Sequence, residues 1–298
     1  MQLPDIHNKS PSIAGFRLTR VGITNLKKQV KVVRSGRQIT LMPVIDISVN
    51  LPSTQKGAHM SRNLEVTNEI VEESIKNPVD SLEELCEEIS KGLLDKHEYA
   101  NFAEVKMRSE YFLERKSPRG TDSLENYILI ARAMSSRTDK NIETRKQIGV
   151  EAIGMTACPC AMETVRELIK NENGIDTPEM NKIPFISHNQ RNRTSLIIEV
   201  PEKYQVEADD LIEIVESSFS SPTYELLKRQ DEGELVLNAH KNPKFVEDVV
   251  RDILAKIIEK YQDLPDDVQV SVLSESLESI HKHNAFAERV TSLGELRK

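Results

Sequence analysis

The 298-residue chain has little cysteine, no long apolar run and no excess of positive charge. Its three cysteines are too few for a disulfide scaffold, and no apolar stretch approaches the roughly 20 residues that span a bilayer. The N-terminal string MQLPDIHNKS has no apolar signal core. The formal net charge of −8 argues against a broad basic surface. We therefore expect a cytoplasmic protein with neither a membrane nor a nucleic acid as partner.

Two of the three cysteines stand two residues apart in TACPCAMETV. Residues i and i+2 of an extended segment point the same way, and Pro159 biases Cys158 towards an extended backbone. If a helix begins at Ala161, Cys160 lies near its N-terminus, where partial positive charge favours a thiolate. The pair therefore indicates metal or thiolate chemistry. The alternative is that two small apolar side chains pack at the end of a strand.

A catalytic metal commonly takes three protein ligands and leaves one position for water. The leading histidine is His188 in ISHNQRN, and the candidate carboxylate is Glu232 in LLKRQDEGELV. Spacing does not choose between Glu232 and three nearby acids, which are Glu225, Asp231 and Glu234. Hydrogen-bond donors for an anionic or heterocyclic ligand follow His188 directly, and these are Asn189, Gln190 and Arg191.

Three further side chains towards the C-terminus suit either a role in catalysis or binding, or an ordinary surface position. His281 and His283 in ESLESIHKHNAFAE suit general acid–base work, or belong to a solvated tail. Glu247 falls in the first turns of an expected helix. It either accepts two N–H bonds from a purine or pterin edge, or is an ordinary acidic residue favoured by the helix dipole.

Hydrophobic periodicity predicts one order of elements in each half of the chain: strands, helices, then strands. The expected strands are 39–52, 103–114, 126–134, 144–159, 194–201 and 267–276, and the expected helices are 81–99, 161–171, 208–219 and 243–261. GAHMSRNLEV and ISHNQRNRTSLIIEV also share His-x-x-Arg-Asn. We therefore predict tandem modules at 1–118 and 119–298, with their boundary in the turn-rich SPRGTDS segment.

Several uncommon strings in one order resemble the prokaryotic GTP cyclohydrolases outside the classical type I family, almost from end to end. The strings are LPDIH, VGITNL, GAHMSR, ACPCAMETV, SHNQRN, LLKRQDE, NPKFVEDVVRD and ESIHKHNAFAE. The segment RELIKNENGIDTPEMNKIPFI makes the chain most similar to the archaeal, type IV branch, because bacterial type IB enzymes have a much shorter connection there.

The resemblance implies an α+β fold of two tandem tunnelling-fold (T-fold) modules. Each module has an antiparallel sheet with helices packed on one face, and the modules assemble into barrels. A homo-oligomer, dimer or tetramer, with active sites at its interfaces is implied as well.

The resemblance also implies the ligands of one divalent metal per active site. Cys158, His188 and Glu232 resemble the ligands, and Cys160 resembles the essential thiol, although the two cysteines could exchange roles. Fe(II) is the metal implied, whereas zinc or manganese would suit the same donors.

Substrate contacts follow from the same resemblance. Glu247 resembles the purine-anchoring glutamate, and His281 resembles the acid–base histidine, with His283 as the alternative. Cations for a triphosphate are expected at Arg62, Arg191 and Arg229, each of which suits a surface salt bridge equally well.

The implied substrate is GTP. Hydroxide attacks C8 of the guanine, the imidazole ring opens, formate leaves, and the ribose rearranges and closes into a dihydropterin. The archaeal branch implies a 2′,3′-cyclic phosphate with loss of pyrophosphate. The alternatives are a type IB-like enzyme that makes dihydroneopterin triphosphate, a T-fold nitrile reductase, and a non-catalytic purine-binding protein.

Overall fold

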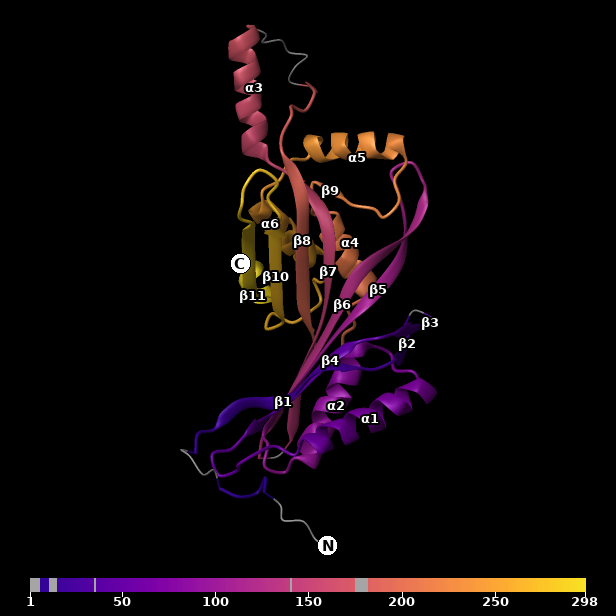
Figure 1. Cartoon of the computed structure of the whole chain (residues 1–298), viewed down its shortest axis with the longest axis vertical. Coiled ribbons are helices and arrows are strands. Elements are labelled where there is room, and N and C mark those ends of the chain that lie inside the picture. Colours follow the sequence, from indigo (N-terminus) through magenta and orange to yellow (C-terminus); the bar gives the residue numbers. More distant parts are fainter. Residues whose placement is uncertain (1–5, 11–14, 35, 140, 175–181) are drawn as a thin grey trace. The chain divides into compact units, whose positions relative to one another are not determined.

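The structure, a computed structural model, describes residues 6–10, 15–34, 36–139, 141–174 and 182–298 (Figure 1). It divides into two compact units. Unit 1 comprises Met1–Glu110, Leu129–Ile148 and Glu199–Lys203, and unit 2 comprises Tyr111–Ile128, Gly149–Ile198 and Tyr204–Lys298. Each unit takes segments from both sides of the expected boundary at residue 118, so that division of the sequence stays a prediction.

Four long strands contribute residues to both units. They are β5 (Phe102–Lys116), β6 (Asp122–Arg137), β7 (Ile142–Ala157) and β8 (Asn189–Val200). The SPRGTDS segment forms the turn between β5 and β6, where the Ser117 amide donates to the Thr121 carbonyl at 2.9 Å. Gly120 in this turn has φ +83°, a conformation that glycine adopts without strain.

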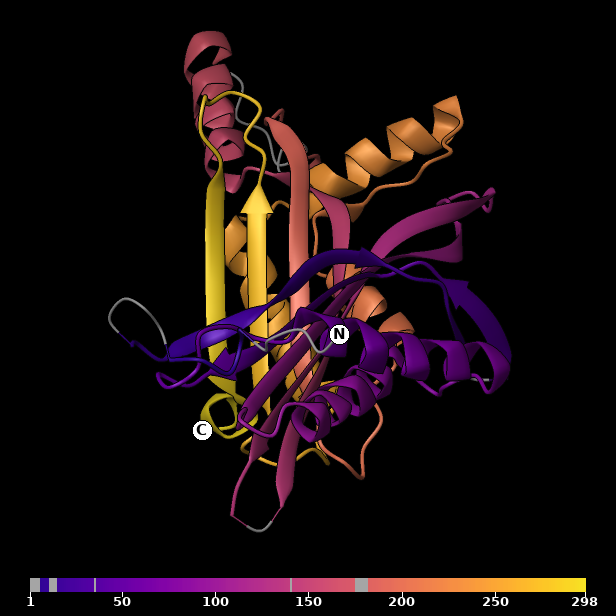
Figure 2. The ribbon, with the colours of Figure 1, turned by 60° about the horizontal axis from the view of Figure 1, so that its bottom comes forward.

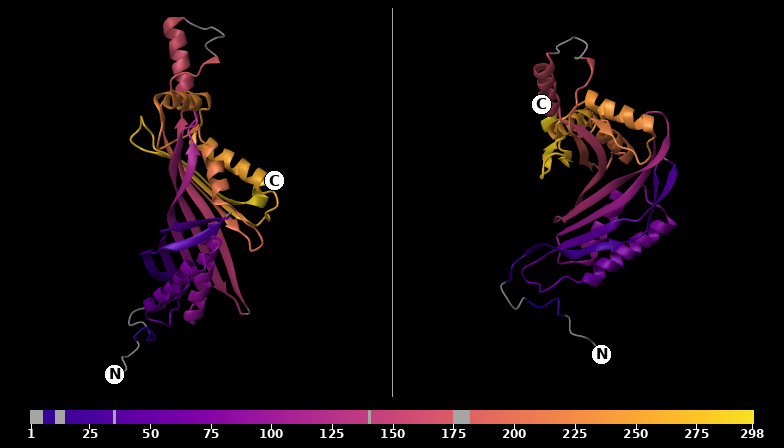
Figure 3. Two further views of the ribbon diagram at one scale, coloured as in Figure 1. Left: turned by 90° about the vertical axis from the view of Figure 1, so that its right-hand side faces the viewer. Right: turned by 45° about the horizontal axis from the view of Figure 1, so that its top comes forward.

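Unit 1 places two helices along one face of its strands (Figure 3). β1 (Leu18–Lys27) pairs antiparallel with β4 (Val44–Leu51), β4 pairs antiparallel with β5, and β2 (Val30–Arg34) and β3 (Arg37–Leu41) form a separate hairpin. Helix α1 (Met60–Lys76) packs on α2 (Leu82–Lys96). The predicted helix at 81–99 is confirmed, and its apolar residues Leu85, Cys86, Ile89 and Leu93 are fully buried. Core packing therefore accounts for Cys86.

Unit 2 extends β8 by two antiparallel strands, β10 (Gln269–Ser276) and β11 (Ala285–Ser292), which lie side by side in Figure 2. Short β9 (Ser221–Pro222) pairs with β7. The helices of unit 2 are α3 (Pro159–Asn173), α4 (Ala208–Glu216), α5 (Arg229–Lys241), α6 (Val246–Lys260) and α7 (Leu293–Leu296). Helix α6 packs on β10 and β11, with Val249, Ile253 and Ile257 fully buried.

The shared His-x-x-Arg-Asn string does not mark equivalent positions. His59 is the N-cap of helix α1, whereas His188 directly precedes strand β8. Part of the segment used to select the archaeal branch, residues 175–181, lies outside the described residues. Within the described ranges, none of the helices is long and apolar enough to cross a membrane.

A histidine of unit 1 is locked in its neutral form. His97, the C-cap of α2, is fully buried and lies 2.6 Å from Asn63 Oδ1 through Nε2. The Tyr99 hydroxyl lies 2.8 Å from Nδ1, so the ring donates to Asn63 and accepts from Tyr99. Burial, followed by the charges of Arg62 and His59, lowers the pKa of His97 from 6.5 to about 4.

The lowered pKa of His97 predicts a pH-dependent stability. Because the unfolded chain takes up this proton near pH 6.5 and the folded chain only near pH 4, stability falls as pH drops through that window. The loss amounts to about 3 kcal/mol when complete. We expect His97→Gln to flatten the decline of the unfolding free energy between pH 7 and 4.5, measured by urea titration against wild type. Parallel pH curves for the two proteins would contradict this assignment.

Candidate functional site

The Cys-Pro-Cys segment joins the end of β7 to the start of α3. Cys158 is the N-cap of α3, with Pro159 in the first turn, and its sulfur accepts the Ala161 amide at 3.4 Å. Cys158 is half-buried, whereas Cys160, inside the first turn, is exposed. The predicted extended backbone at Cys158 and the predicted helix start are both confirmed. The free N–H groups of this helix end place partial positive charge next to the Cys158 sulfur.

The structure brings His188 to Cys158. The Cys158 amide donates to the His188 carbonyl at 3.1 Å, and the Ser187 hydroxyl donates to the Cys158 carbonyl at 2.6 Å. His240 at the end of α5 lies 3.2 Å from the Ser187 carbonyl through Nε2. A thiol and an imidazole that are distant in sequence therefore share one end of unit 2.

Two side chains hold the His188 ring: Gln190, which the sequence assigned to ligand binding, and Glu278, which it did not assign to the site. Gln190 Oε1 lies 2.9 Å from His188 Nδ1, and Glu278 Oε2 lies 3.7 Å from the same nitrogen. The Gln190 amide group donates to Glu278 and to Thr156, and its donation to a ligand stays a prediction. Glu278 stands three residues before His281 in ESLESIHKH, and that proximity was the one signal for it in the sequence.

Both C-terminal histidines lie beside His188. They occupy the loop between β10 and β11, and their rings stack with centroids 5.0 Å apart. The His281 ring meets the His188 ring edge-on at 6.4 Å. His281 and His283 are exposed, whereas the His188 side chain is mostly buried, so the two exposed rings lie between His188 and the solvent side of the loop.

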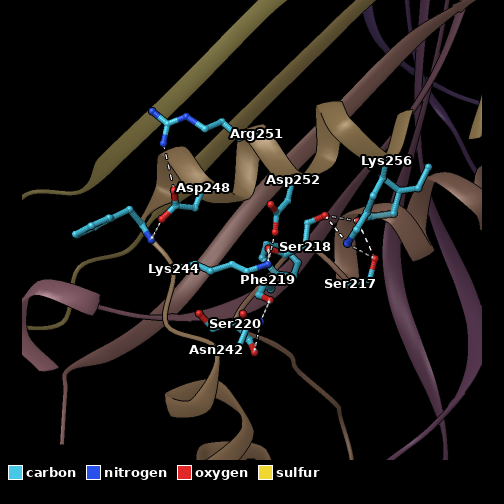
Figure 4. Close-up of polar contacts among 12 residues, drawn as sticks. Ser217, Ser218, Phe219, Ser220, Asn242, Lys244, Asp248, Arg251, Asp252 and Lys256 are labelled. Carbon is cyan, nitrogen blue, oxygen red and sulfur yellow. Dashed lines mark hydrogen bonds and ion pairs between the residues drawn. The ribbon is translucent and has the colours of Figure 1, made fainter. Parts of the chain in front are cut away.

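Hydrogen bonds hold Ala157, the last residue of β7, and Figure 4 shows the side-chain bonds of its partner Lys244. The Ala157 amide donates to Ser220 Oγ at 3.2 Å, and its carbonyl accepts the Lys244 amide at 3.0 Å. Lys244 Nζ donates to the Ser218 carbonyl at 3.0 Å and pairs with Asp252 of α6. Glu247 lies exposed in the first turn of that helix. The predicted place of Glu247 at a helix start is confirmed, and the Lys244 bond ties that start to the cysteine segment.

Glu232 lies at the other end of α5 from the His240 contact. Eight residues separate Glu232 from His240, which is about 12 Å along a helix axis. The neighbouring Asp231 accepts bonds from Ser117 Oγ at 2.7 Å and from the Arg119 amide at 3.1 Å, which anchors this end to the β5–β6 turn. Glu232 itself is exposed. Within the described ranges, no three His, Cys, Asp or Glu side chains form a group that could hold a metal ion.

The three arginines expected to bind phosphate lie apart in sequence and setting. Arg62 belongs to unit 1 and donates to the Lys96 carbonyl at 3.1 Å. Arg191 is exposed on β8, and Arg229 is exposed as the first residue of α5. Their phosphate contacts stay predictions.

The donor types present suit a divalent metal. A thiol and an imidazole are common ligands of zinc and of iron, and Cys158 and His188 are linked through their backbones. The Nδ1 atom of the His188 ring faces the Gln190 side chain. This leaves Nε2 as the nitrogen for a ligand. The backbones of two of the three expected ligands are thus hydrogen-bonded to each other, whereas Glu232 lies near the start of α5.

Solved structures of low sequence identity share the fold. The uricase from Arthrobacter globiformis matches with TM-score 0.54 over 92% of this chain and 93% of its own, at 7% identity. The urate oxidase of Bacillus sp. TB-90 matches with TM-score 0.51 over 92% and 99%, at 12% identity. The expected α+β architecture of tandem T-fold modules is confirmed by these matches.

Proteins of much higher similarity are named GTP cyclohydrolase MptA. The protein of that name from Methanothermobacter thermautotrophicus is 47% identical over 99% of this chain and 95% of its own. The one from Methanocaldococcus jannaschii is 45% identical over 99% and 96%. A family profile described as type I GTP cyclohydrolase folE2 matches residues 3–287. The chain therefore belongs to the folE2-type GTP cyclohydrolase family.

Proposed function

We propose that the chain converts GTP to 7,8-dihydroneopterin 2′,3′-cyclic phosphate, with release of formate and pyrophosphate, for pterin cofactor biosynthesis. The observation that carries this proposal is the full-length similarity to proteins named GTP cyclohydrolase MptA, at 43–47% identity. The convergence of Cys158 and His188 supports it, because a hydrolytic ring opening needs an activated water.

The proposed ligands of the divalent metal, Fe(II) by preference, are Cys158, His188 and Glu232. A bound divalent ion lowers the pKa of its water and so supplies hydroxide near neutral pH. Because Glu232 does not join the other two within the described chain, we propose that assembly of a homo-oligomer completes the ligand set. The active sites would then lie at subunit interfaces, as the family resemblance implies.

The chain's own residues divide the remaining work. Cys160, exposed in the first turn of α3, is the proposed substrate-facing thiol. His281 lies within one ring contact of His188, so it is placed to move protons to and from the opening imidazole, with His283 stacked behind it. Glu247 is proposed to accept two N–H bonds from the guanine edge and so hold the base in register.

The negatively charged triphosphate of the substrate needs cationic side chains. Arg62, Arg191 and Arg229 are the proposed phosphate contacts, and guanidinium groups suit phosphate because they donate in pairs. The two exposed ones, Arg191 and Arg229, belong to unit 2 with the cysteine segment.

A second product deserves a test because the matching family is described as type I GTP cyclohydrolase. A type IB-like reaction would keep the triphosphate on the dihydroneopterin. Both reactions release formate, so the pterin and its phosphates distinguish them.

Anaerobic incubation of the purified protein with GTP and Fe(II), followed by mass analysis, tests the proposed reaction. We expect the cyclic phosphate together with equal amounts of formate and pyrophosphate. A dihydroneopterin that retains three phosphates would replace the proposed product with the type IB product. Turnover that survives a strong chelator would contradict the metal dependence.

Two single substitutions separate metal binding from chemistry. His188→Ala removes a proposed ligand, so we expect loss of most bound metal and of formate release. Cys160→Ala removes an exposed thiol outside the proposed ligand set, so we expect normal metal content with formate release abolished. Metal content by elemental analysis and formate assays report on both, and each variant serves as the other's control. Full metal occupancy in His188→Ala would remove this residue from the ligand set.

A further inference from the structure

The side-chain amide of Gln190 is oriented by its surroundings. Its Nε2 lies 3.3 Å from Glu278 Oε1 and 3.3 Å from Thr156 Oγ1, so both of its hydrogens have acceptors. Its Oε1 then faces His188 Nδ1 at 2.9 Å. Gln190 is 9% exposed, and the side chains of His188 and Glu278 are 11% and 12% exposed, so water competes little for these bonds.

From this arrangement we propose that Gln190, oriented by Glu278, is a positioning residue that holds the His188 proton on Nδ1 and leaves the lone pair on Nε2. An amide oxygen only accepts, so the ring nitrogen that faces it must donate. A neutral imidazole with its proton on Nδ1 then has one unprotonated nitrogen, Nε2. The proposal rests on the proposed function only for the identity of the ligand, a divalent metal.

The opposite orientation of the amide is unfavourable. It would place the Gln190 oxygen against the Glu278 carboxylate, which as a carboxylate also only accepts. It would at the same time point the amide hydrogens at His188 Nδ1. The negative charge of Glu278 therefore selects the Gln190 orientation, and Gln190 in turn selects the tautomer. Glu278 reinforces the choice directly, with Oε2 3.7 Å from Nδ1.

Buried hydroxyl and amide groups hold Gln190 in place from behind. Thr156 Oγ1 lies 3.0 Å from Ser276 Oγ, which accepts from Asn192 Nδ2 at 3.5 Å. Thr194 Oγ1 and Ser274 Oγ donate to Asn192 Oδ1 at 2.7 and 2.9 Å. These residues come from β7, β8 and β10 and are at most 2% exposed. A hydrogen-bonded network inside a sheet resists rearrangement. The three strands therefore hold Gln190, and through it the His188 ring, in one orientation.

The consequence for a metal is a prepared ligand. A metal-binding histidine usually donates a hydrogen bond from its second ring N–H to a carboxylate or carbonyl. This bond fixes the orientation and the tautomer of the ring before the ion binds. Here the side-chain carbonyl of Gln190 takes that place, and the Glu278 carboxylate accepts a hydrogen bond from the same amide group. Without it, the ring would have to shift its proton before binding.

The tautomer is measured directly in the metal-free protein labelled with ¹⁵N-histidine. Long-range ¹H–¹⁵N spectra distinguish a protonated from an unprotonated ring nitrogen, and the His188 signals are assigned by their absence in His188→Ala. We expect a protonated Nδ1 and an unprotonated Nε2. A proton on Nε2 would overturn the proposal. The tautomer is read in the wild-type protein, and His188→Ala serves only to assign the signals.

The affinity for Zn²⁺ measures the effect on binding. Gln190→Met keeps the shape of the side chain and removes its polar atoms, so we expect zinc to bind about 10–100-fold more weakly in competition with a chromophoric chelator. Glu275→Gln is the control, because Glu275 lies on β10, the neighbour of β8, and pairs with Arg193 instead. We expect its zinc affinity to equal that of wild type. An unchanged affinity in folded Gln190→Met would overturn the positioning role.

Neither measurement uses GTP, so the outcomes separate. Absence of GTP turnover in the wild type would defeat the proposed function and leave the tautomer as measured. A proton on Nε2 would defeat the positioning role and leave turnover as measured.

Discussion

The hydrogen bond from the Cys158 amide to the His188 carbonyl is the contact on which the candidate site depends. It joins the end of β7 to the start of β8, and so it brings the backbones of Cys158 and His188 together although the chain between them makes a whole helix. The segment is held from below as well, because Ala157 is bonded on both sides of its peptide by Ser220 and Lys244. Two of these three bonds are between backbone groups, so substitution of the Cys158, His188 or Lys244 side chain leaves them in place.

The two units use buried histidine in different ways. His97 in unit 1 is closed on both nitrogens by Asn63 and Tyr99, so it stays neutral and serves the fold. His188 in unit 2 is held through Nδ1, and the ring edge-on to it belongs to the exposed His281. Histidine thus has a structural role where both ring nitrogens are hydrogen-bonded, and it can bind a ligand where one ring nitrogen is left for it.

Several features of the fold and of the site could be predicted from the sequence because they depend on local pattern. The apolar stripe of α2, the helix start after Cys158 and the first-turn position of Glu247 follow from periodicity and capping. Helix α5 was missed because its apolar residues form no clear face and Gly233 interrupts it. Strand β11 was missed because most of its side chains are exposed, so it lacks an alternating pattern.

Contacts across strands explain what the sequence could not supply. Glu278 meets His188 because it follows β10, which pairs with β8, and no spacing in the sequence records that register. Gln190 instead stands only two residues after His188, so its contact depends on local spacing. The matching strings around His59 and His188 were misleading because one begins a helix and the other begins a strand. The recurring family strings carried the cyclohydrolase assignment because they depend on residue identity and order, which the full-length similarity to the MptA proteins confirms.

X-ray absorption spectroscopy at the zinc edge of the metal-loaded oligomer tests most directly whether Cys158 and His188 share one ion. A shared site predicts one sulfur scatterer at about 2.3 Å together with nitrogen and oxygen scatterers at about 2.0–2.2 Å. The sulfur scatterer should persist in Cys160→Ala and vanish in Cys158→Ala. A first shell of nitrogen and oxygen alone in the wild type would contradict the shared site.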